Sequence, residues 1–218
     1  MSRILKFTAV LLLAFVLAGC ASRQAAPTLA PAKSAEADAL YAQAQEMLHN
    51  QDIEEAVRLL NKSVKAGSPE AAFLLSVIYD EYKVPGVTPE QGRPNADNLL
   101  RQAAEAGYAP AQVSLAQAYE HGRFGEGRMA DALEWYKRIA LQGNADAKFT
   151  VGYIYASSGK VPRDYAEAAK WYAMGADQNH LGCINNLAIL YTWGMGVPQS
   201  WGKAIELYQR LVDQGYEL

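Results

Sequence analysis

Cysteine and histidine are scarce in this chain of 218 residues. There are two cysteines, Cys20 and Cys183, and three histidines, His49, His121 and His180. The sequence also lacks a glycine-rich phosphate loop after a strand, an H-E-x-x-H pattern and a G-x-S-x-G pattern. We therefore expect neither a cofactor nor an enzymatic activity.

An excess of positive charge is also missing. The chain has 20 Lys and Arg against 23 Asp and Glu, a formal net charge of −3. No basic patch with interleaved aromatic residues occurs, and such a patch is what nucleic-acid binding requires. Nucleic acid is therefore not an expected partner.

The N-terminus carries an apolar run that is too short to span a bilayer. Arg3 and Lys6 precede the run, which extends over residues 7–17 and ends in L-A-G-C at Cys20. This layout predicts a secretory signal over residues 1–19. The L-A-G-C segment resembles a bacterial lipobox, and the resemblance implies that Cys20 is acylated and becomes the mature N-terminus. The alternative is an ordinary cleaved signal with a chance cysteine.

An acylated Cys20 would anchor the chain to a membrane, and it would leave Cys183 without a disulfide partner in the mature chain. Ala21 follows the cysteine, and lipoproteins without Asp there are usually sent to the outer membrane, so we expect a periplasm-facing outer-membrane protein. The inner membrane and the cell surface remain open. Residues 20–35 are rich in Ala, Pro and Ser and are predicted to form a flexible tether.

From residue 109 onward the sequence repeats with a period of 36 residues, in the blocks 109–144, 145–180 and 181–216. Within each block the apolar and small positions are spaced by 3, 4 and 8 residues, which is typical of one face of a helix. Each block therefore predicts a helix, a glycine-rich turn and a second helix. Two less regular blocks precede them, at 36–68 and 69–108, so we predict five helix pairs over residues 36–218.

The repeated pattern resembles Sel1-like repeats. The segments that carry the resemblance are GYIYASSGKVPRDYAEAAKWYAMGA and LAILYTWGMGVPQSWGKAIELYQRL; the first block looks closer to a tetratricopeptide repeat. The resemblance implies an all-α fold, a right-handed α-solenoid of helix-turn-helix repeats that mediates protein–protein contacts. It implies no particular partner.

The first helices carry the main candidate binding site. In solenoids of helix pairs the first helices line the concave surface, and here the residues beside the packed positions are unusually apolar. An apolar strip facing water usually marks a partner site. The alternative is that the superhelix buries these residues by its own curvature. The candidates are Tyr41, Phe73, Val77, Val113, Gln117, Phe149, Tyr153, Asn185, Ile189 and Trp193.

A weaker candidate is an acidic cluster with one histidine, formed by Asp80, Glu81, Glu120 and His121 at the ends of two neighbouring first helices. Carboxylates and imidazole could bind a metal. A solvated acidic rim is the favoured interpretation, so no metal is expected. Cys183 lies at the position of two alanines one and two periods earlier and is expected to be a small buried residue.

The last second helix is expected to leave an apolar patch at Ile205, Leu207 and Leu211, since repeat arrays normally need a polar terminal cap. A partner protein or a second copy of the chain could cover this patch, or local packing of Tyr216 and Leu218 could suffice.

Together these features predict a membrane-anchored scaffold or adaptor in the bacterial envelope that binds another envelope protein. One alternative is a secretion or polysaccharide-export assembly factor. Another is an envelope hydrolase with cell-wall or β-lactam chemistry, for which the four residues of the acidic cluster are the only candidates.

Overall fold

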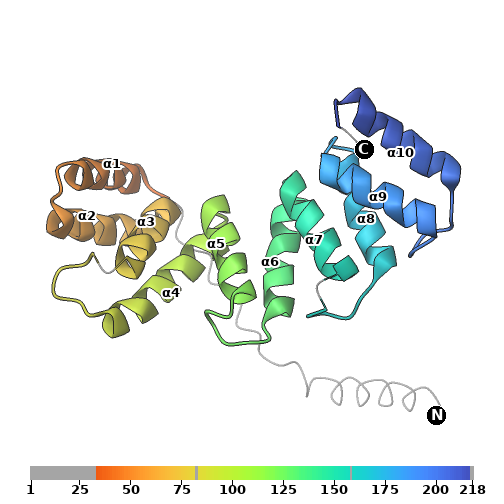
Figure 1. Cartoon of the computed structure of the whole chain (residues 1–218). Coiled ribbons are helices and arrows are strands. Elements are labelled where there is room, and N and C mark those ends of the chain that lie inside the picture. Colours follow the sequence, from red (N-terminus) through yellow and green to blue (C-terminus); the bar gives the residue numbers. More distant parts are fainter. Residues whose placement is uncertain (1–32, 82, 158, 217–218) are drawn as a thin grey trace, which may run out of the picture. The chain divides into compact units, whose positions relative to one another are not determined.

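The structure, a computed structural model, describes residues 33–81, 83–157 and 159–216. These residues form ten helices and no strand (Figure 1), which confirms the predicted all-α solenoid of helix pairs. The helices are α1 (Ala35–His49), α2 (Ile53–Lys65), α3 (Pro69–Asp80), α4 (Pro89–Glu105), α5 (Ala109–Glu120), α6 (Met129–Leu141), α7 (Ala145–Ser157), α8 (Tyr165–Ala176), α9 (Leu181–Trp193) and α10 (Trp201–Asp213).

The helices pack in chain order as five pairs, from α1–α2 to α9–α10. Each helix contacts the one before it and the one after it, and α7 also contacts α9 directly. Residues 33–218 form one compact unit. The predicted signal, Cys20 and most of the predicted tether lie outside the described residues. None of the helices described is both long enough and apolar enough to cross a membrane.

Most of the pairs begin at a residue whose side chain caps the first helix. In four of the five pairs this side chain accepts a hydrogen bond from a backbone N–H three residues on, which satisfies a donor that the helix itself cannot. The capping residues are Ser34, Ser68, Asn144 and His180. His180 replaces Asn144 after one period, so its imidazole Nδ1 has a structural role.

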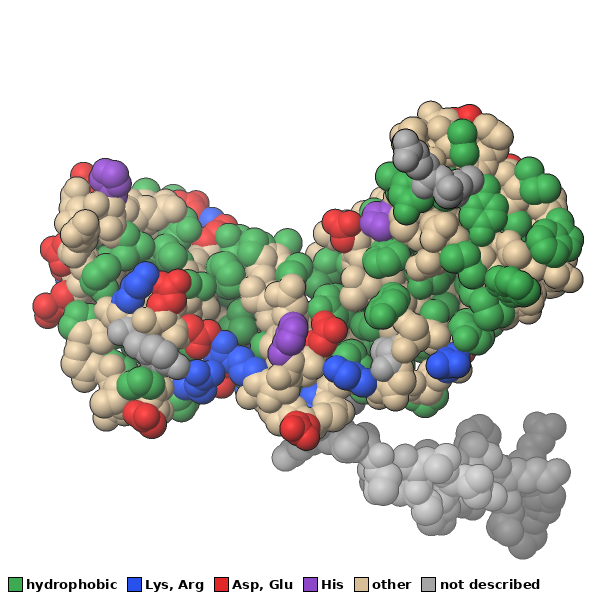
Figure 2. All heavy atoms as spheres, viewed as in Figure 1, with side chains coloured by type: hydrophobic (Ala, Val, Ile, Leu, Met, Phe, Trp, Pro, Cys, Tyr) green, Lys and Arg blue, Asp and Glu red, His purple; other side chains and the backbone are tan. Residues whose placement is uncertain are grey.

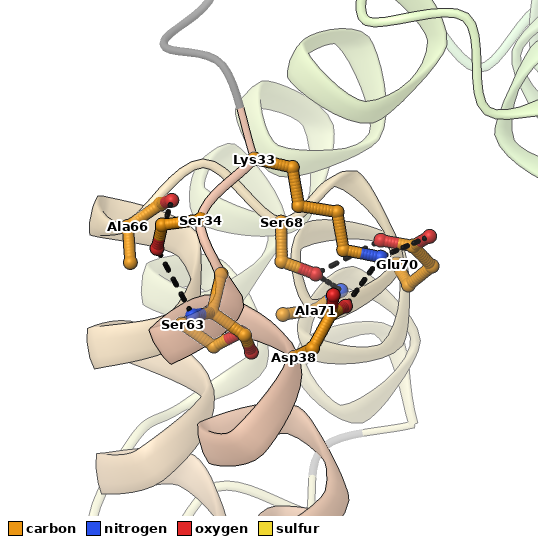
Figure 3. A network of polar contacts seen from close by, with 9 residues as sticks. Lys33, Ser34, Asp38, Ser63, Ala66, Ser68, Glu70 and Ala71 are labelled. Atoms are coloured by element: carbon orange, nitrogen blue, oxygen red, sulfur yellow. Dashed lines mark hydrogen bonds and ion pairs between the residues drawn. The ribbon is translucent and has the colours of Figure 1, made fainter.

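The predicted tether is too long at its C-terminal end. Ser34 caps α1 and also donates to the carbonyl of Ala66 at the end of α2 (3.3 Å; Figure 3). The Lys33 ammonium lies 2.6 Å from Asp38 and 2.8 Å from Glu70. Burial works against ionisation of Glu70, but hydrogen bonds from Lys33 and Ser68 hold the pKa of its carboxyl below the ordinary value. Residues 33–35 therefore belong to the repeat array, because these contacts tie them to the end of α2 and to the second pair.

Small residues let neighbouring helices approach closely in the last two pairs. A Cβ atom at Gly152 would lie 2.5 Å from Cε1 of Tyr172, and one at Gly175 would lie 2.3 Å from Sγ of Cys183. Cys183 is free and fully buried, as expected for a small core residue. Burial raises the pKa of its thiol to about 12.

The expected apolar patch at the last helix needs correction. Leu207 and Leu211 are buried, because they point into the core formed with α8 and α9, and Ile205 alone of the three is exposed. Trp201, Val212 and Tyr216 are also exposed on or next to α10.

Candidate protein-binding surface

The predicted binding residues all lie on the first helices of their pairs, but the structure divides them into two groups. Gln117, Tyr153 and Trp193 are exposed; Tyr153 shows 53% of its surface and Trp193 shows 70%. The others are partly buried: Tyr41, Phe73, Val77, Val113, Phe149, Asn185 and Ile189. Exposure to water therefore describes the first group, and burial by the solenoid itself describes the second.

In the first three pairs the apolar candidates pack against the array itself. The ring of Phe73 lies 5.5 Å from that of Tyr108. Val113 packs against the core of the third and fourth pairs, and Tyr41 packs against the core of the first two. Burial raises the pKa of the Tyr41 hydroxyl. These side chains thus belong to the inner packing of the solenoid.

Phe149 of α7 packs between the last two pairs. Its ring centroid lies 5.4 Å from that of His180 and 6.2 Å from that of Tyr172. Gly182 in the first turn of α9 makes room for it, because a Cβ there would lie 2.8 Å from Cε2 of Phe149. Phe149 therefore fixes α9 against α7 and offers little free surface.

Tyr153 lies one turn further along α7 and stacks on Phe149, with centroids 6.4 Å apart and an interplanar angle of 21°. Trp193 is the last residue of α9, the helix that contacts α7 directly. We call Phe149, Tyr153, Ile189 and Trp193 the aromatic face. In Figure 2 hydrophobic side chains gather over the part of the molecule formed by α7–α10.

The charged groups next to the aromatic face are engaged with each other or with polar groups. The Lys148 ammonium, in a largely buried side chain, donates to Oε1 of Gln178 (2.6 Å). His180 Nε2 lies 3.1 Å from the Asp146 carboxylate. A neutral face with two projecting aromatic side chains suits the capture of an apolar segment, because aromatic anchors dominate the energetics of protein interfaces.

The residues of the acidic cluster have other partners in the structure. Asp80 accepts from the guanidinium of Arg123 (2.7 Å), and Glu120 accepts from the hydroxyl of Tyr136 (2.7 Å). His121 Nδ1 lies 2.7 Å from the carbonyl oxygen of Gln117, and Glu81 pairs with Lys83. Among the described residues no group of three or more His, Cys, Asp or Glu is placed to hold a metal ion. The cluster is therefore not assembled as a site.

Arg123 makes contacts between helix pairs that the sequence did not predict. It lies in the turn between α5 and α6, and its guanidinium bonds both Asp80 of α3 and, through Nε, Asp97 of α4 (2.7 Å). It also lies over the ring of Phe124. In the sequence it is one of two Arg residues in a glycine-rich turn, and spacing alone does not reveal which carboxylates it reaches.

The comparisons with known proteins agree with this architecture. The Sel1 repeat pattern matches residues 35–68, 109–144, 145–180 and 182–216. Chitin synthase regulatory factor 3 of Schizosaccharomyces pombe is 35% identical over 118 residues, which is 50% of this chain and 12% of that protein.

Two solved structures are also similar. The Sel1 repeat protein from Oxalobacter formigenes has a TM-score of 0.72 at 25% identity, covering 84% of this chain and 53% of that one. The c5321 protective antigen of uropathogenic Escherichia coli has a TM-score of 0.63 at 29% identity, covering 82% of this chain and 38% of that one. This chain thus spans about half or less of the length of these three relatives. Because the repeat pattern matches well over half of the sequence, the chain belongs to the Sel1 repeat family, whose members are typically non-enzymatic and generally mediate protein–protein interactions.

Proposed function

We propose that this chain is a lipid-anchored adaptor of the bacterial envelope that holds another envelope protein on its aromatic face. The observation that carries the proposal is the exposure of Tyr153 and Trp193 on α7 and α9, two first helices in direct contact. Exposed aromatic side chains of this kind are costly to leave in water and are favoured at binding sites.

The anchoring part of the proposal rests on the first 20 residues. A basic start, a short apolar run and L-A-G-C together favour acylation of Cys20. Ala21 favours the outer membrane with the repeats facing the periplasm. The Ala-, Pro- and Ser-rich residues 21–32 would then give the repeat array reach from the bilayer.

The aromatic face would work by holding its partner without turnover. Phe149 is fixed by Tyr172, His180 and the space left at Gly182, and it supports the stacked ring of Tyr153. A surface that is ordered before binding loses little side-chain entropy when the partner arrives. The partner segment that fits is apolar and uncharged, either extended or helical.

The hydrolase alternative has no supporting observation in the described residues. Asp80, Glu120 and His121 are each engaged in a structural contact. A secretion or export assembly factor would need the same holding surface. That alternative is therefore one role that the proposed adaptor could have.

The anchor is tested by fractionating cells that express Cys20→Ser, with Cys183→Ala as the control. We expect the first variant to leave the membrane fraction or to remain unprocessed, and to take up no labelled palmitate. The control should stay membrane-bound and labelled. Labelling of the Cys20→Ser protein would contradict an anchor at this residue.

The binding surface is tested by covalent crosslinking in intact envelopes followed by purification of the chain. We expect the Tyr153→Ser/Trp193→Ser double variant to lose most of the partner that the wild type captures. Gln117→Ser is the matched control, because Gln117 lies one period before Tyr153 and is also exposed. Equal loss in both variants, or no loss in the double variant, would contradict the proposed face.

A further inference from the structure

The last second helix exposes positions that are buried in the preceding pairs. Ile205 corresponds to Ala169 and Leu133 at intervals of 36 residues, and the exposed fractions are 65% against 4% and 6%. Val212 is 48% exposed, whereas its equivalents, Ala176 and Ala140, are buried. In the earlier pairs these positions are covered where the next pair stacks, so α10 presents a surface built to receive a helix.

The exposed residues form one stripe, the α10 stripe, which consists of Trp201, Ile205, Tyr208, Val212 and Tyr216. Spacings of four, three and four residues place Trp201, Ile205, Tyr208 and Val212 on one side of the helix, and Tyr216 follows shortly after the helix ends at Asp213. Trp201 and Tyr216 show 59% and 45% of their surfaces, and Tyr208 is partly buried. The stripe itself contains no charged residue.

The cations of α10 are engaged away from the stripe. Arg210 donates to the carbonyl of Ala176 (2.6 Å) and to Oδ1 of Asn179 (3.1 Å), and Lys203 lies over the ring of Tyr191. Helical periodicity also places both of them on the side away from Ile205. The occupant of the stripe is therefore apolar and needs no charge of its own.

The other end of the array does not offer a matching surface. Among the described residues, the large exposed hydrophobic side chains all lie at Leu141 or later. The apolar residues of α1, such as Leu40, Met47 and Leu48, pack against the core of their own two pairs. Head-to-tail stacking of α10 onto α1 would thus bury apolar side chains against a largely polar face.

We propose that the α10 stripe pairs with the α10 stripe of a second copy, with the two helices antiparallel. This arrangement puts Trp201 of each copy opposite Tyr216 of the other, and Ile205 opposite Val212, with Tyr208 and Gln209 near the two-fold axis. Such a contact is self-complementary and closed, so it yields a dimer and no fibre.

The area of the stripe fits a moderately stable dimer. The four most exposed side chains present on the order of 400 Å² per copy, given the sizes of aromatic and aliphatic side chains. Two copies would bury roughly 800 Å² from these residues, and a polar rim brings the total close to the ~1,200 Å² of small specific interfaces. We expect a dissociation constant on the order of 1 µM.

Self-association is independent of the proposed partner site, because the stripe lies on α10 and the aromatic face on α7 and α9. The direct test is sedimentation of the full chain in density-matched detergent across a concentration series. Ile205→Glu is the disrupting variant, and Leu141→Glu is the matched control on an equally exposed residue of α6. Helical content measured by circular dichroism shows that both variants fold.

We expect the wild type and Leu141→Glu to dimerise alike, and Ile205→Glu to dimerise at least ~100-fold more weakly, because symmetry would bury two carboxylates. A wild type that is monomeric at ~100 µM, far above the expected dissociation constant, would overturn the proposal. Equal dimerisation of all three proteins would also overturn it.

Cysteine crosslinking tests the antiparallel geometry. Gln209→Cys places a thiol near the two-fold axis, whereas Lys203→Cys places one on the other side of the helix. Mild oxidation should link Gln209→Cys into a covalent dimer at several times the yield of Lys203→Cys and of the parent chain, which retains Cys20 and the buried Cys183. Equal yields from all three would contradict the antiparallel pairing.

Discussion

The first three helix pairs and the last two share one packing scheme but differ in what they expose. In α1–α6 polar contacts tie neighbouring pairs together: Lys33 bridges Asp38 and Glu70, and Arg123 bridges Asp80 and Asp97. In α7–α10 Arg210 likewise bonds the carbonyl of Ala176, close packing at Gly175 and Gly182 adds to this contact, and Tyr153, Trp193, Trp201 and Ile205 are exposed. The difference shows that the repeat specifies the core and leaves the surface free to vary.

Gln117 and Tyr153 illustrate this variation of the surface. Both are exposed at equivalent positions of α5 and α7. One position carries a polar amide and the other an aromatic ring. The repeat thus accommodates an exposed aromatic side chain at a position that carries an exposed amide one period earlier.

The largest expected effect in the last two pairs is on the alkylation rate of the Cys183 thiol. Because burial raises its pKa to about 12 from the ordinary 9.0, we expect the native thiol to react with iodoacetamide at pH 8 ~1,000-fold more slowly than a free thiol. The rate is measured by mass spectrometry on the Cys20→Ser chain. The same chain in denaturant should react at the free-thiol rate; a native rate within tenfold of that value would mean that α9 opens readily.

Gly152→Ala should strongly destabilise the last two pairs. The added methyl would clash with the ring of Tyr172 at 2.5 Å, and overpacking of this kind costs about 2–3 kcal/mol of unfolding free energy. Gly202→Ala is the control, since nothing lies within 4 Å of its Cβ position, and it should change stability by about 0.5 kcal/mol or less. Denaturant unfolding measures both, and equal effects would show that helix approach at Gly152 is looser than described.

Arg123→Ala tests the polar contacts of the first three pairs. It leaves Asp80 and Asp97 close together without their cation, which should cost about 2 kcal/mol for a partly buried bridge. The Arg128→Ala control breaks a more exposed pair with Asp131 and should cost about 0.5 kcal/mol or less. If both substitutions have the same small effect, the bridge does not hold α3, α4 and the α5–α6 turn together.

Alkaline pH should weaken the last two pairs. Burial raises the pKa of Cys183 from 9.0 and that of Tyr172 from 10.0, each to about 12. Between pH 9 and 12 the folded chain therefore holds more protons than the unfolded chain, and stability falls as pH rises. We expect a loss of about 2 kcal/mol from pH 8 to pH 10 in denaturant titrations. Cys183→Ala should show a smaller loss over the same interval; an identical loss would exclude the thiol as its source.

Tyr153→Ser should have the smallest effect on stability, about 0.5 kcal/mol or less, because the side chain is half exposed. Phe149→Ser, by contrast, should cost about 2–3 kcal/mol, since that ring packs on Tyr172 and His180. Thermal unfolding of both variants separates a binding residue from a structural one. Equal destabilisation would place Tyr153 in the core.

Much of the fold could be predicted from the sequence because the repeat makes each position testable several times. The period of 36 residues predicted the helix pairs and the burial of Cys183, and the structure confirms both. Proximity between repeats was harder to predict. Whether Phe149 projects or packs depends on the space at Gly182, and which carboxylates Arg123 reaches depends on how a turn folds back.

The α10 stripe is a second case in which contacts between repeats could not be predicted from the sequence. Leu207 and Leu211 were expected to be exposed and are buried, whereas Trp201 and Val212 are exposed. The apolar period identifies helix positions that are covered within a repeat. It does not distinguish them from positions that are covered only by the next repeat.

The central claim is that the aromatic face, and not the equivalent surface of the first three pairs, binds the partner. Site-specific photocrosslinking in intact cells tests it, with a photoreactive phenylalanine placed at Tyr153 or at Gln117, one period earlier. We predict a discrete covalent adduct from position 153 that is abolished by Trp193→Ser, and none from position 117. An adduct of equal yield at both positions, or one at 117 alone, would contradict the account.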